Sequence, residues 1–318
     1  MEPYNKLLIP LPFGLNNTGV ICYFNSFLQL LCGCSTFTKI VLTNDTYLST
    51  TKTGTAIFDY VKLYSESPLK TDALSLSTKK ILLALCIDLK ERRPNISFGR
   101  GQESAHEVFI LLLDMMEPNS ESSDNPIISS IKSPITKLFL HKSMWNLYCK
   151  DCKTVVSKKV DYGVIFDMHH MDNIEFEHSP EGFSSLIRQH ASLVTDYKCE
   201  PCKKITETVR IYDLRKIPEI VFCSFNVYRE FGGKKYCRYF PPFLLLPAIE
   251  EGKHHKFILI GQIEHSGSLA GGHYWAKSLR KHNDDIIPYE INDMGISTSE
   301  FKSTPNTYII LYHYSETI

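Results

Sequence analysis

Residues 14–29 read GLNNTGVICYFNSFLQ, a turn-rich run joined directly to a helical pattern. The first six residues contain two glycines and two asparagines, which favour turns and which a helix would not tolerate. Apolar residues then follow at helical spacing, and Gly33 offers a C-terminal stop. The pattern predicts a helix that begins near Cys22 and carries Phe24, Phe27, Leu28 and Leu31.

Cys22 is the first candidate for a catalytic residue, because it stands at the expected start of this helix. There the unpaired backbone N–H groups and the helix dipole stabilise a thiolate and lower the thiol pKa. Asn17, which precedes it in the turn, has a side-chain amide that can donate to an oxyanion. Taken alone, the fragment is better explained as a small buried cysteine, which is what most free cysteines are.

A second helix is predicted from about residue 102 to residue 117. Its apolar residues form one stripe at i, i+3, i+4, i+7, i+8 and i+11. Three carboxylates, Glu103, Glu107 and Asp114, fall within a narrow arc on another face. For an arbitrary helix such an arc is a solvated face.

Four segments of the C-terminal third are rich in aromatic and β-branched residues, which favour strands. They are 257–263, 274–279, 288–291 and 307–314. Helical patterns thus come first and strands later, with few βαβ alternations. This order favours an α+β fold over a doubly wound sheet.

His273 is the best candidate for a base that would activate a thiol. Gly271 and Gly272 precede it, and glycines permit close approach of a substrate backbone. Asn292 and Asp293 follow after an apolar strand, at a spacing that suits the hairpin partner of the strand after His273. Adjacent strand residues point to opposite faces, so only one of the two is expected to reach the imidazole directly. Each feature alone also fits an ordinary surface loop or turn.

Two near-copies, YCKDCK at 148–153 and YKCEPCK at 197–203, predict a metal site. Four thiolates at such spacing make a closed structural Zn²⁺ site, one ion per chain. Two redox CxxC motifs are the alternative, but these would need a thioredoxin-like context that the flanks lack. With no open coordination position, the metal is expected to hold β-hairpins together rather than to catalyse. The ligands are Cys149, Cys152, Cys199 and Cys202.

The composition excludes several other classes. The chain has 318 residues, with 35 Lys and Arg against 35 Asp and Glu, so its formal net charge is zero. Binders of nucleic acid or of membrane surfaces need a surplus of basic charge. Ten cysteines are too few for a disulfide scaffold, and the first 15 residues lack the features of a secretory signal. We therefore expect an intracellular protein, cytoplasmic or nuclear, and a monomer.

Several motifs together resemble those of the ubiquitin-specific proteases, a family of papain-like cysteine deubiquitinases. Residues 14–29 look like the family's cysteine box, and residues 101–114 look like its glutamine-rich helix. HSG at 265–267, GGHY at 271–274 and IND at 291–293 look like its histidine box. Within these motifs, Val20-Ile21 replace the usual small polar residues, and Ser104 stands where the family commonly has Asp.

The rest of the chain fits the same resemblance. The paired CxxC motifs match the family's zinc-bearing fingers, and YIILY at 308–312 matches its closing strand. The resemblance covers nearly the whole chain and implies one catalytic domain, residues 1–318, of thumb–palm–fingers architecture. Its expected parts are a thumb at about 1–125, fingers at about 138–210 and a palm at about 211–318.

The resemblance also implies roles for the candidate residues. Cys22 would attack the carbonyl of the C-terminal glycine of ubiquitin and form a thioester, with His273 as base and then acid. Asn292 would orient the imidazole, with Asp293 as the alternative or an auxiliary group, and Asn17 would stabilise the oxyanion. For the substrate, Glu107 would pair with an arginine of the ubiquitin tail, and Gly272 and Tyr274 would line the channel for that tail.

Two alternatives stay open. One is a related hydrolase for a ubiquitin-like modifier, for which the missing carboxylate at Ser104 is relevant. The other is a zinc-stabilised ubiquitin-binding protein with little catalysis. The presence of Cys22, His273 and Asn292 argues against the second, since a pure binder needs none of them.

Overall fold

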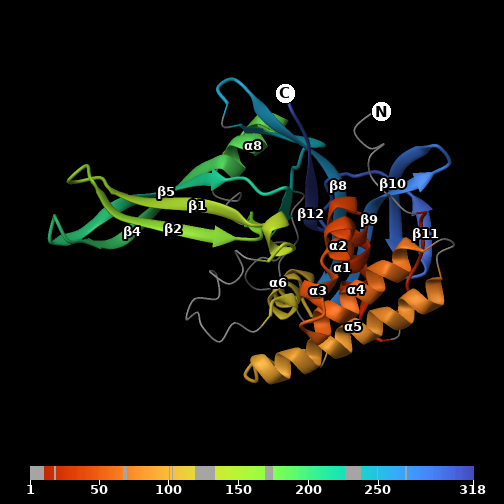
Figure 1. Cartoon of the computed structure of the whole chain (residues 1–318). Helices are drawn as coiled ribbons and strands as arrows, with labels where there is room; N and C mark the ends of the chain where they lie inside the picture. Colours follow the sequence, from red (N-terminus) through yellow and green to blue (C-terminus); the bar gives the residue numbers. More distant parts are fainter. Residues whose placement is uncertain are drawn as a thin grey trace.

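The computed structural model describes residues 11–17, 19–66, 70–99, 101, 103–118, 133–168, 175–225, 238–248, 250–268 and 271–318. It has three parts: a group of helices, a central sheet, and a long narrow sheet that projects from the centre (Figure 1). We call them thumb, palm and fingers. The helices come first and most strands later, which confirms the expected α+β class.

The thumb is built from the N-terminal helices, with α1 in the middle and buried over its whole length. As predicted, α1 starts at Cys22 and ends before Gly33, but the reason for the glycine differs. Gly33 has an ordinary helical φ of −70°, whereas a Cβ there would lie 2.0 Å from the Ser278 Oγ on the palm. The helices are α1 (Cys22–Cys32), α2 (Ser35–Thr43), α3 (Asp45–Leu48), α4 (Lys52–Ser65), α5 (Thr71–Arg92) and α6 (Ala105–Met116).

The second predicted helix is α6, and it starts later than expected. Ser104 has an extended backbone and precedes the first helical residue, so α6 covers Ala105–Met116. Glu103 is therefore not on the helix and does not share a face with the two later carboxylates. Instead its side chain accepts a hydrogen bond from the Gly99 N–H at 2.9 Å. Gln102, the expected start, lies outside the described residues.

Among the described residues, no single helix has the length and apolar character needed to cross a membrane. Within the described part of the chain, α1 and α2 taken together have the required length and composition, but the two helices are bent by 87° relative to each other.

The palm is a sheet in the order β11-β10-β9-β8-β12-β6-β3, with β7 also paired to β8. All neighbours are antiparallel except β3 and β6, which are parallel. Each of the four predicted strands is present and longer than expected. The palm strands are β3 (Phe166–Asp167), β6 (Ile220–Ser224), β7 (Phe243–Pro247), β8 (His254–Ser268), β9 (Gly271–His282), β10 (Asp285–Asn292), β11 (Gly295–Thr298) and β12 (Thr307–Thr317).

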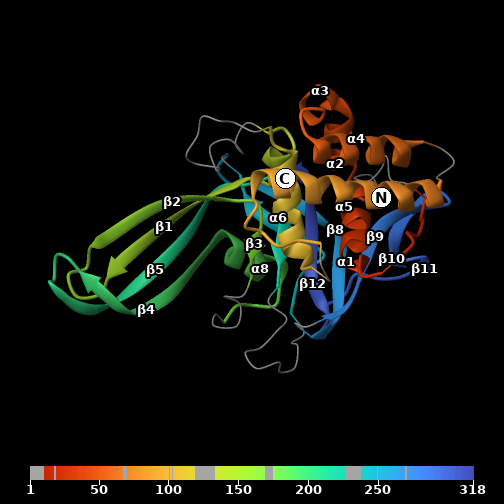
Figure 2. The ribbon, with the colours of Figure 1, turned by 90° about the horizontal axis from the view of Figure 1, so that it is seen from below.

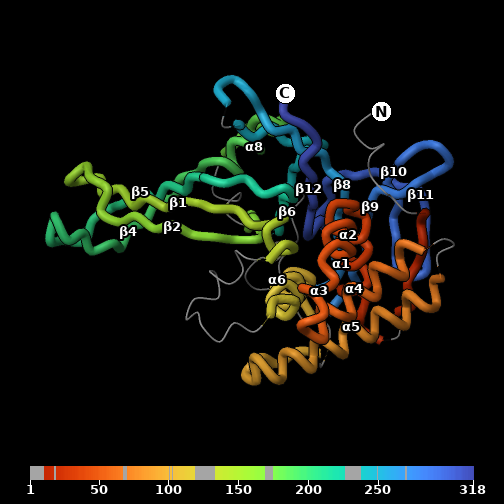
Figure 3. The backbone as a smooth tube through the Cα atoms, in the orientation of Figure 1, coloured from red at the N-terminus to blue at the C-terminus, as the bar shows by residue number. Residues whose placement is uncertain are grey.

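The fingers are a four-stranded antiparallel sheet in the order β2-β1-β5-β4. Its strands are β1 (His141–Cys149), β2 (Val155–Gly163), β4 (Gln189–Cys199) and β5 (Lys204–Lys216). The chain runs out to the tip and back twice, so the two hairpin ends lie together at the far end (Figure 3). A view from below shows the fingers extending away from the thumb (Figure 2).

Between its two excursions into the fingers, the chain returns to the palm. Strand β3 pairs with β6, and helix α8 (Pro180–Arg188) packs against β7 as well as against β4 and β5. The Ser184 hydroxyl on α8 accepts a hydrogen bond from the Leu245 N–H at 2.9 Å. The stretch between β2 and β4 thus forms the joint between fingers and palm.

Phe109 of α6 connects thumb and palm through contacts with three other aromatic rings, of which that of Phe222 is stacked on it. Its ring lies 5.5 Å from that of Phe27 on α1 and 4.4 Å from that of Phe222 on β6. Phe139, just before the fingers, lies 4.9 Å away. All four side chains are fully buried, and removing one such ring costs about 3–5 kcal/mol. This core fixes α1 relative to the palm strands that carry the candidate site.

Candidate active site and metal centre

Cys22 is the first residue of α1, and its thiol is buried against the palm. Burial raises the pKa of the Cys22 thiol and the Asp293 carboxylate raises it further, while a hydrogen bond from the Tyr274 N–H lowers it. The net shift is upward, which corrects the expectation that the helix dipole lowers this pKa. Desolvation outweighs the dipole because the thiol is covered by β9. At neutral pH the resting thiol therefore needs a base.

His273 and Asn292 lie on adjacent strands and meet directly. The distance from His273 Nε2 to Asn292 Oδ1 is 2.6 Å. In the β9–β10 ladder Ile291 faces Ala276, so Asn292 comes opposite Trp275, which shares a strand face with His273. Asn292 is the member of the Asn-Asp pair that makes this contact. Asp293 follows the end of β10, so the alternation of strand faces does not decide its direction. The Asp293 Oδ2 is 3.9 Å from the same ring nitrogen.

Asp293 ties the turn after β10 to the segment before α1. It has a left-handed backbone, with φ of 50°, and its carbonyl accepts a hydrogen bond from Leu15 N–H at 3.0 Å. Its carboxylate accepts from Asn17 Nδ2 at 3.0 Å and from Asn25 Nδ2 at 3.1 Å. In turn, the Asn17 Oδ1 accepts from the Ile21 N–H at 3.3 Å. One carboxylate thus holds the amide of Asn17 beside the start of α1.

Asn25 was not recognised in the sequence, although it is part of this network. Its side chain is 3% exposed and also donates to the Asn16 carbonyl at 3.3 Å. The sequence does contain a feature that points to Asn25. Asn25 and Gln29 are polar residues at i, i+4 spacing in a helix that is otherwise mostly apolar. Such residues on a buried helix must have partners.

The candidate substrate residues are in two places. Gly272 and Tyr274 flank His273 on β9, and a Cβ on Gly272 would lie 2.4 Å from the His265 Nε2. The Tyr274 ring is buried, 4.2 Å from the ring of His265. Glu107 is exposed on the first turn of α6. Its carboxylate is close enough to raise the pKa of the Tyr308 hydroxyl, after the larger effect of burial.

The four cysteines of the CxxC pairs meet at the fingertip. Their sulfur atoms all lie within 4.8 Å of one another, with 3.8 Å between Cys149 and Cys202 and 3.9 Å between Cys152 and Cys199. A tetrahedral site with Zn–S bonds of about 2.3 Å has sulfur–sulfur edges of about 3.8 Å. The cluster therefore fits a metal ion of the size and preference of Zn²⁺.

The two turns that supply these thiols share one backbone form. The residues after the second cysteines, Lys153 and Lys203, have left-handed φ of 56° and 53°. Each turn is closed by pairing of its first cysteine with the residue five positions on, Thr154 in one and Lys204 in the other. The near-repeat in sequence is thus a near-repeat in structure.

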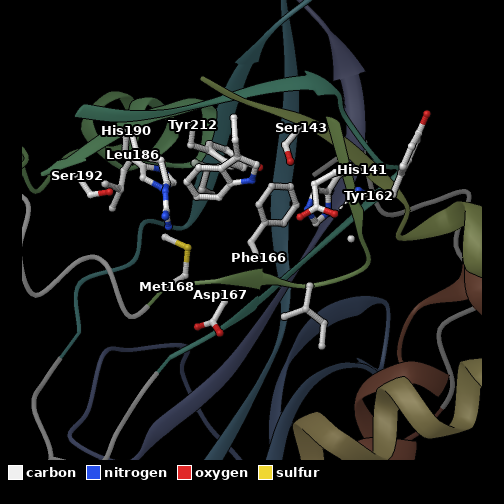
Figure 4. Close-up of a pocket in the computed structure, with 16 residues that line it drawn as sticks. His141, Ser143, Tyr162, Phe166, Asp167, Met168, Leu186, His190, Ser192 and Tyr212 are labelled. Atoms are coloured by element: carbon white, nitrogen blue, oxygen red, sulfur yellow. Dashed lines mark hydrogen bonds between the residues drawn. The ribbon is translucent and has the colours of Figure 1, made fainter. Parts of the chain in front are cut away.

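A cavity that the sequence does not predict lies where the fingers meet the palm (Figure 4). It is a cavity of about 450 Å³ between the finger strands, β3 and α8. Trp145 and Tyr212 line it from the finger sheet, with rings 4.9 Å apart. His141 and Phe166, stacked at 4.0 Å, line its other side. Individually such aromatic residues carry no sequence signal, because strands of many kinds contain them.

The arrangement of the candidate catalytic residues is typical of one class of enzyme. A cysteine at the start of a buried helix faces a strand that carries a histidine held by an asparagine, and this is the layout of papain-like cysteine proteases. The chain belongs to the ubiquitin carboxyl-terminal hydrolase family, whose model matches residues 13–312.

Relatives and structural neighbours agree with this assignment. Ubiquitin carboxyl-terminal hydrolase 25 of Arabidopsis thaliana is 26% identical, over 83% of this chain and 42% of its own length. Hydrolase 4 of the same organism is 22% identical, over 94% and 92%. The SAGA DUB module Ubp8/Sgf11/Sus1/Sgf73 bound to monoubiquitin contains a chain with a TM-score of 0.72 and 15% identity. The match covers 100% of this chain and 71% of that one, and shows a shared fold. This chain spans less than half of the first relative.

Proposed function

We propose that this protein is a thiol hydrolase that cleaves the isopeptide or peptide bond after the C-terminal glycine of ubiquitin. The observation that carries the proposal is the 2.6 Å contact of His273 with Asn292, next to a buried Cys22 thiol that interacts with the Tyr274 N–H and the Asp293 carboxylate. Membership of the ubiquitin carboxyl-terminal hydrolase family supports it.

In the proposed reaction, His273 takes the proton of the Cys22 thiol while the sulfur attacks the glycine carbonyl carbon. Since Nε2 of His273 is held by Asn292, Nδ1 is the ring atom that exchanges this proton. The imidazolium then protonates the leaving amine as the carbon–nitrogen bond breaks, which leaves a thioester on Cys22. His273 next takes a proton from water, whose hydroxide attacks the thioester carbonyl and breaks the carbon–sulfur bond. Ubiquitin leaves with a free C-terminal carboxyl group, and the imidazolium returns its proton to the Cys22 sulfur.

Asn17 is proposed as the donor to the oxyanion that forms during each attack. One hydrogen of its Nδ2 is used by Asp293, and the second remains for the oxyanion. Asp293 therefore acts as a positioning group for Asn17, while Asn292 orients the imidazole. This assigns different tasks to two neighbouring residues.

For the substrate, we propose that the ubiquitin tail lies between α6 and β9, with its two glycines passing Gly272 and Tyr274. Glu107 is exposed and placed to pair with a basic tail residue. The aromatic cavity at the base of the fingers is proposed to contact the folded body of ubiquitin. The SAGA DUB module, which contains a chain of similar fold, has one structure with bound monoubiquitin and another with bound ubiquitin aldehyde.

We propose one structural Zn²⁺ per chain, held by Cys149, Cys152, Cys199 and Cys202. Bound there, the ion joins the two finger hairpins and takes no part in the hydrolysis. The free thiol of Cys22 and the four metal-binding cysteines all need a reducing environment, which supports an intracellular location.

The test is turnover of ubiquitin that carries a fluorogenic C-terminal amide. The wild type should release the fluorophore, Cys22→Ala should abolish release, and His273→Ala should lower kcat by about 100-fold or more. Asp285→Asn, at the exposed far end of β10, serves as the control and should keep full activity. Tight binding of ubiquitin without release of the fluorophore would instead show that the protein is a ubiquitin-binding protein with little catalysis.

A ubiquitin-like modifier is the alternative substrate, and one contact favours testing it. The Ser104 hydroxyl hydrogen-bonds the Tyr308 hydroxyl at 2.8 Å. Because serine is uncharged, this position offers no negative charge to a basic tail. The same fluorogenic assay with ubiquitin and its relatives side by side decides the matter. If a ubiquitin-like modifier is turned over faster than ubiquitin, that modifier becomes the proposed substrate.

A further inference from the structure

Arg280 on β9 is a fully buried cation that the proposed reaction does not use. Its side chain is 0% exposed and is among the largest fully buried side chains of the protein. Among the described residues, no ion pair joins it to a carboxylate. Its partners are neutral: Nη2 donates to Gln29 Oε1 at 2.7 Å and to the Gln29 carbonyl at 3.0 Å. Nη1 donates to Ser278 Oγ at 2.7 Å and to the Leu279 carbonyl at 2.8 Å. Burying an unpaired charge is costly, so its place needs an explanation.

The C-terminal end of α1 supplies the missing negative partner. The last carbonyls of a helix carry a partial negative charge that a cation stabilises. Helix α1 has no basic residue of its own in the last turn, and Arg280 reaches the Gln29 carbonyl from the neighbouring strand. The nearby Cys32 thiol does not serve as an anion, because burial raises its pKa to about 12.

Gln29 extends the contact to a third segment. Its Oε1 accepts from Arg280, while its Nε2 donates to the Phe13 carbonyl at 3.0 Å. The Arg280 guanidinium also lies 5.8 Å from the Phe13 ring centre. Gln29 is 1% exposed and Phe13 is 3% exposed, so these contacts are shielded from water.

These three segments are the ones that carry the proposed catalytic groups. Cys22 is on α1, two helical turns before Gln29; His273 is on β9 with Arg280; and Asn17 follows Phe13 closely. α1 and β9 lie side by side in both ribbon views (Figures 1 and 2). They touch at one end through Cys22 and Tyr274, and at the other through Gln29 and Arg280.

We propose that Arg280 and Gln29 form a positioning clamp that keeps Cys22, His273 and Asn17 in mutual register. The inference rests on the proposed hydrolase function. The clamp touches no substrate; it fixes the far end of α1 so that the near end presents its thiol to the imidazole. Small misplacements of reacting groups have large effects on rate, so loosening the clamp lowers kcat.

The test compares Arg280→Met, Gln29→Met, the double variant and Arg280→Lys in the ubiquitin amide assay. Each methionine variant should lower kcat by about 10- to 100-fold with little change in KM. The double variant should be no slower than the worse single one, because the two residues act as a unit. Arg280→Lys keeps the charge and should recover part of the rate. Lys281→Met, at the exposed neighbouring position, is the matched control and should keep the wild-type rate.

Hydrogen exchange separates positioning from general loss of stability and does not depend on ubiquitin. In Arg280→Met the Leu15 amide, which donates to the Asp293 carbonyl, should exchange faster than in the wild type. Leu85→Ala, which removes a buried side chain of α5, should destabilise the fold without this local effect.

Two results would overturn the clamp: a folded Arg280→Met with wild-type kcat, or the same Leu15 exchange in Arg280→Met as in Leu85→Ala. An inactive wild type would instead overturn the proposed function, and the exchange of Leu15 would then decide the clamp alone.

Discussion

Asp293 illustrates how a single residue sets the chemistry of the thiol. Its carboxylate is 3.9 Å from His273 Nε2, accepts hydrogen bonds from two asparagines, and contributes to the raised pKa of Cys22. The strand pattern predicts that Asn292 or Asp293 faces the histidine, but not where the other one goes. That depends on the left-handed backbone at Asp293, which non-glycine residues rarely adopt and which the sequence does not signal.

Replacing this charge should make the thiol more acidic. In Asp293→Asn the negative charge that raises the Cys22 pKa is lost, so the thiolate should form at lower pH. The measurement is the rate of Cys22 alkylation by iodoacetamide against pH, followed by peptide mass spectrometry. The half-maximal rate should move to lower pH than in the wild type.

Asp285→Asn, at the exposed far end of β10, is the control and should leave this profile in place. A profile in Asp293→Asn that is unchanged or moves to higher pH would show that the carboxylate does not act on the thiol.

At the scale of elements, the motifs with fixed spacing could be predicted and the tertiary contacts could not. The CxxC pairs and the start of α1 follow from local rules about metal ligands, turn residues and the spacing of apolar residues. Arg280 does not, because charged residues are exposed by default, and its burial depends on the end of a helix far away in sequence. Periodicity predicts Glu103 on the second helix, whereas α6 begins only after Ser104.

The fingertip should depend on its metal. We expect about one Zn²⁺ per chain by elemental analysis, and loss of the ion in Cys149→Ser. The melting temperature of this variant should fall by about 5 °C or more, since the three remaining thiols without a cation no longer join the hairpins. Cys86→Ser, outside the cluster, should retain both the zinc and the melting temperature. A stable wild type without metal would contradict the assignment.

For the whole molecule, two buried histidines make the free energy of unfolding depend on pH. Burial lowers the pKa of His141 to about 4 and that of His313 to about 4, from an ordinary value of 6.5. Their neutral forms are favoured in the folded protein, so the unfolded chain binds more protons below pH 6.5. Stability should therefore fall as the pH drops from about 6.5 to about 4.

His141→Phe should reduce this loss, because phenylalanine does not titrate and retains a ring to stack on Phe166. The reduction should be at most about 3 kcal/mol, the equivalent of the shift in pKa. Urea unfolding at pH 7 and at pH 4.5 measures it, with the exposed His254→Gln as control. An equal loss of stability in His141→Phe and the wild type would contradict the assignment to His141.

In the proposed reaction Cys22, with His273 as base and Asn292 orienting the imidazole, attacks the C-terminal carbonyl of ubiquitin. The most direct measurement is reaction with ubiquitin that carries a C-terminal electrophile, followed by intact mass and peptide mapping. One ubiquitin should be joined to each chain through Cys22, and Cys22→Ala should give no adduct. An adduct on another cysteine, or none with a wild type that binds ubiquitin, would contradict it.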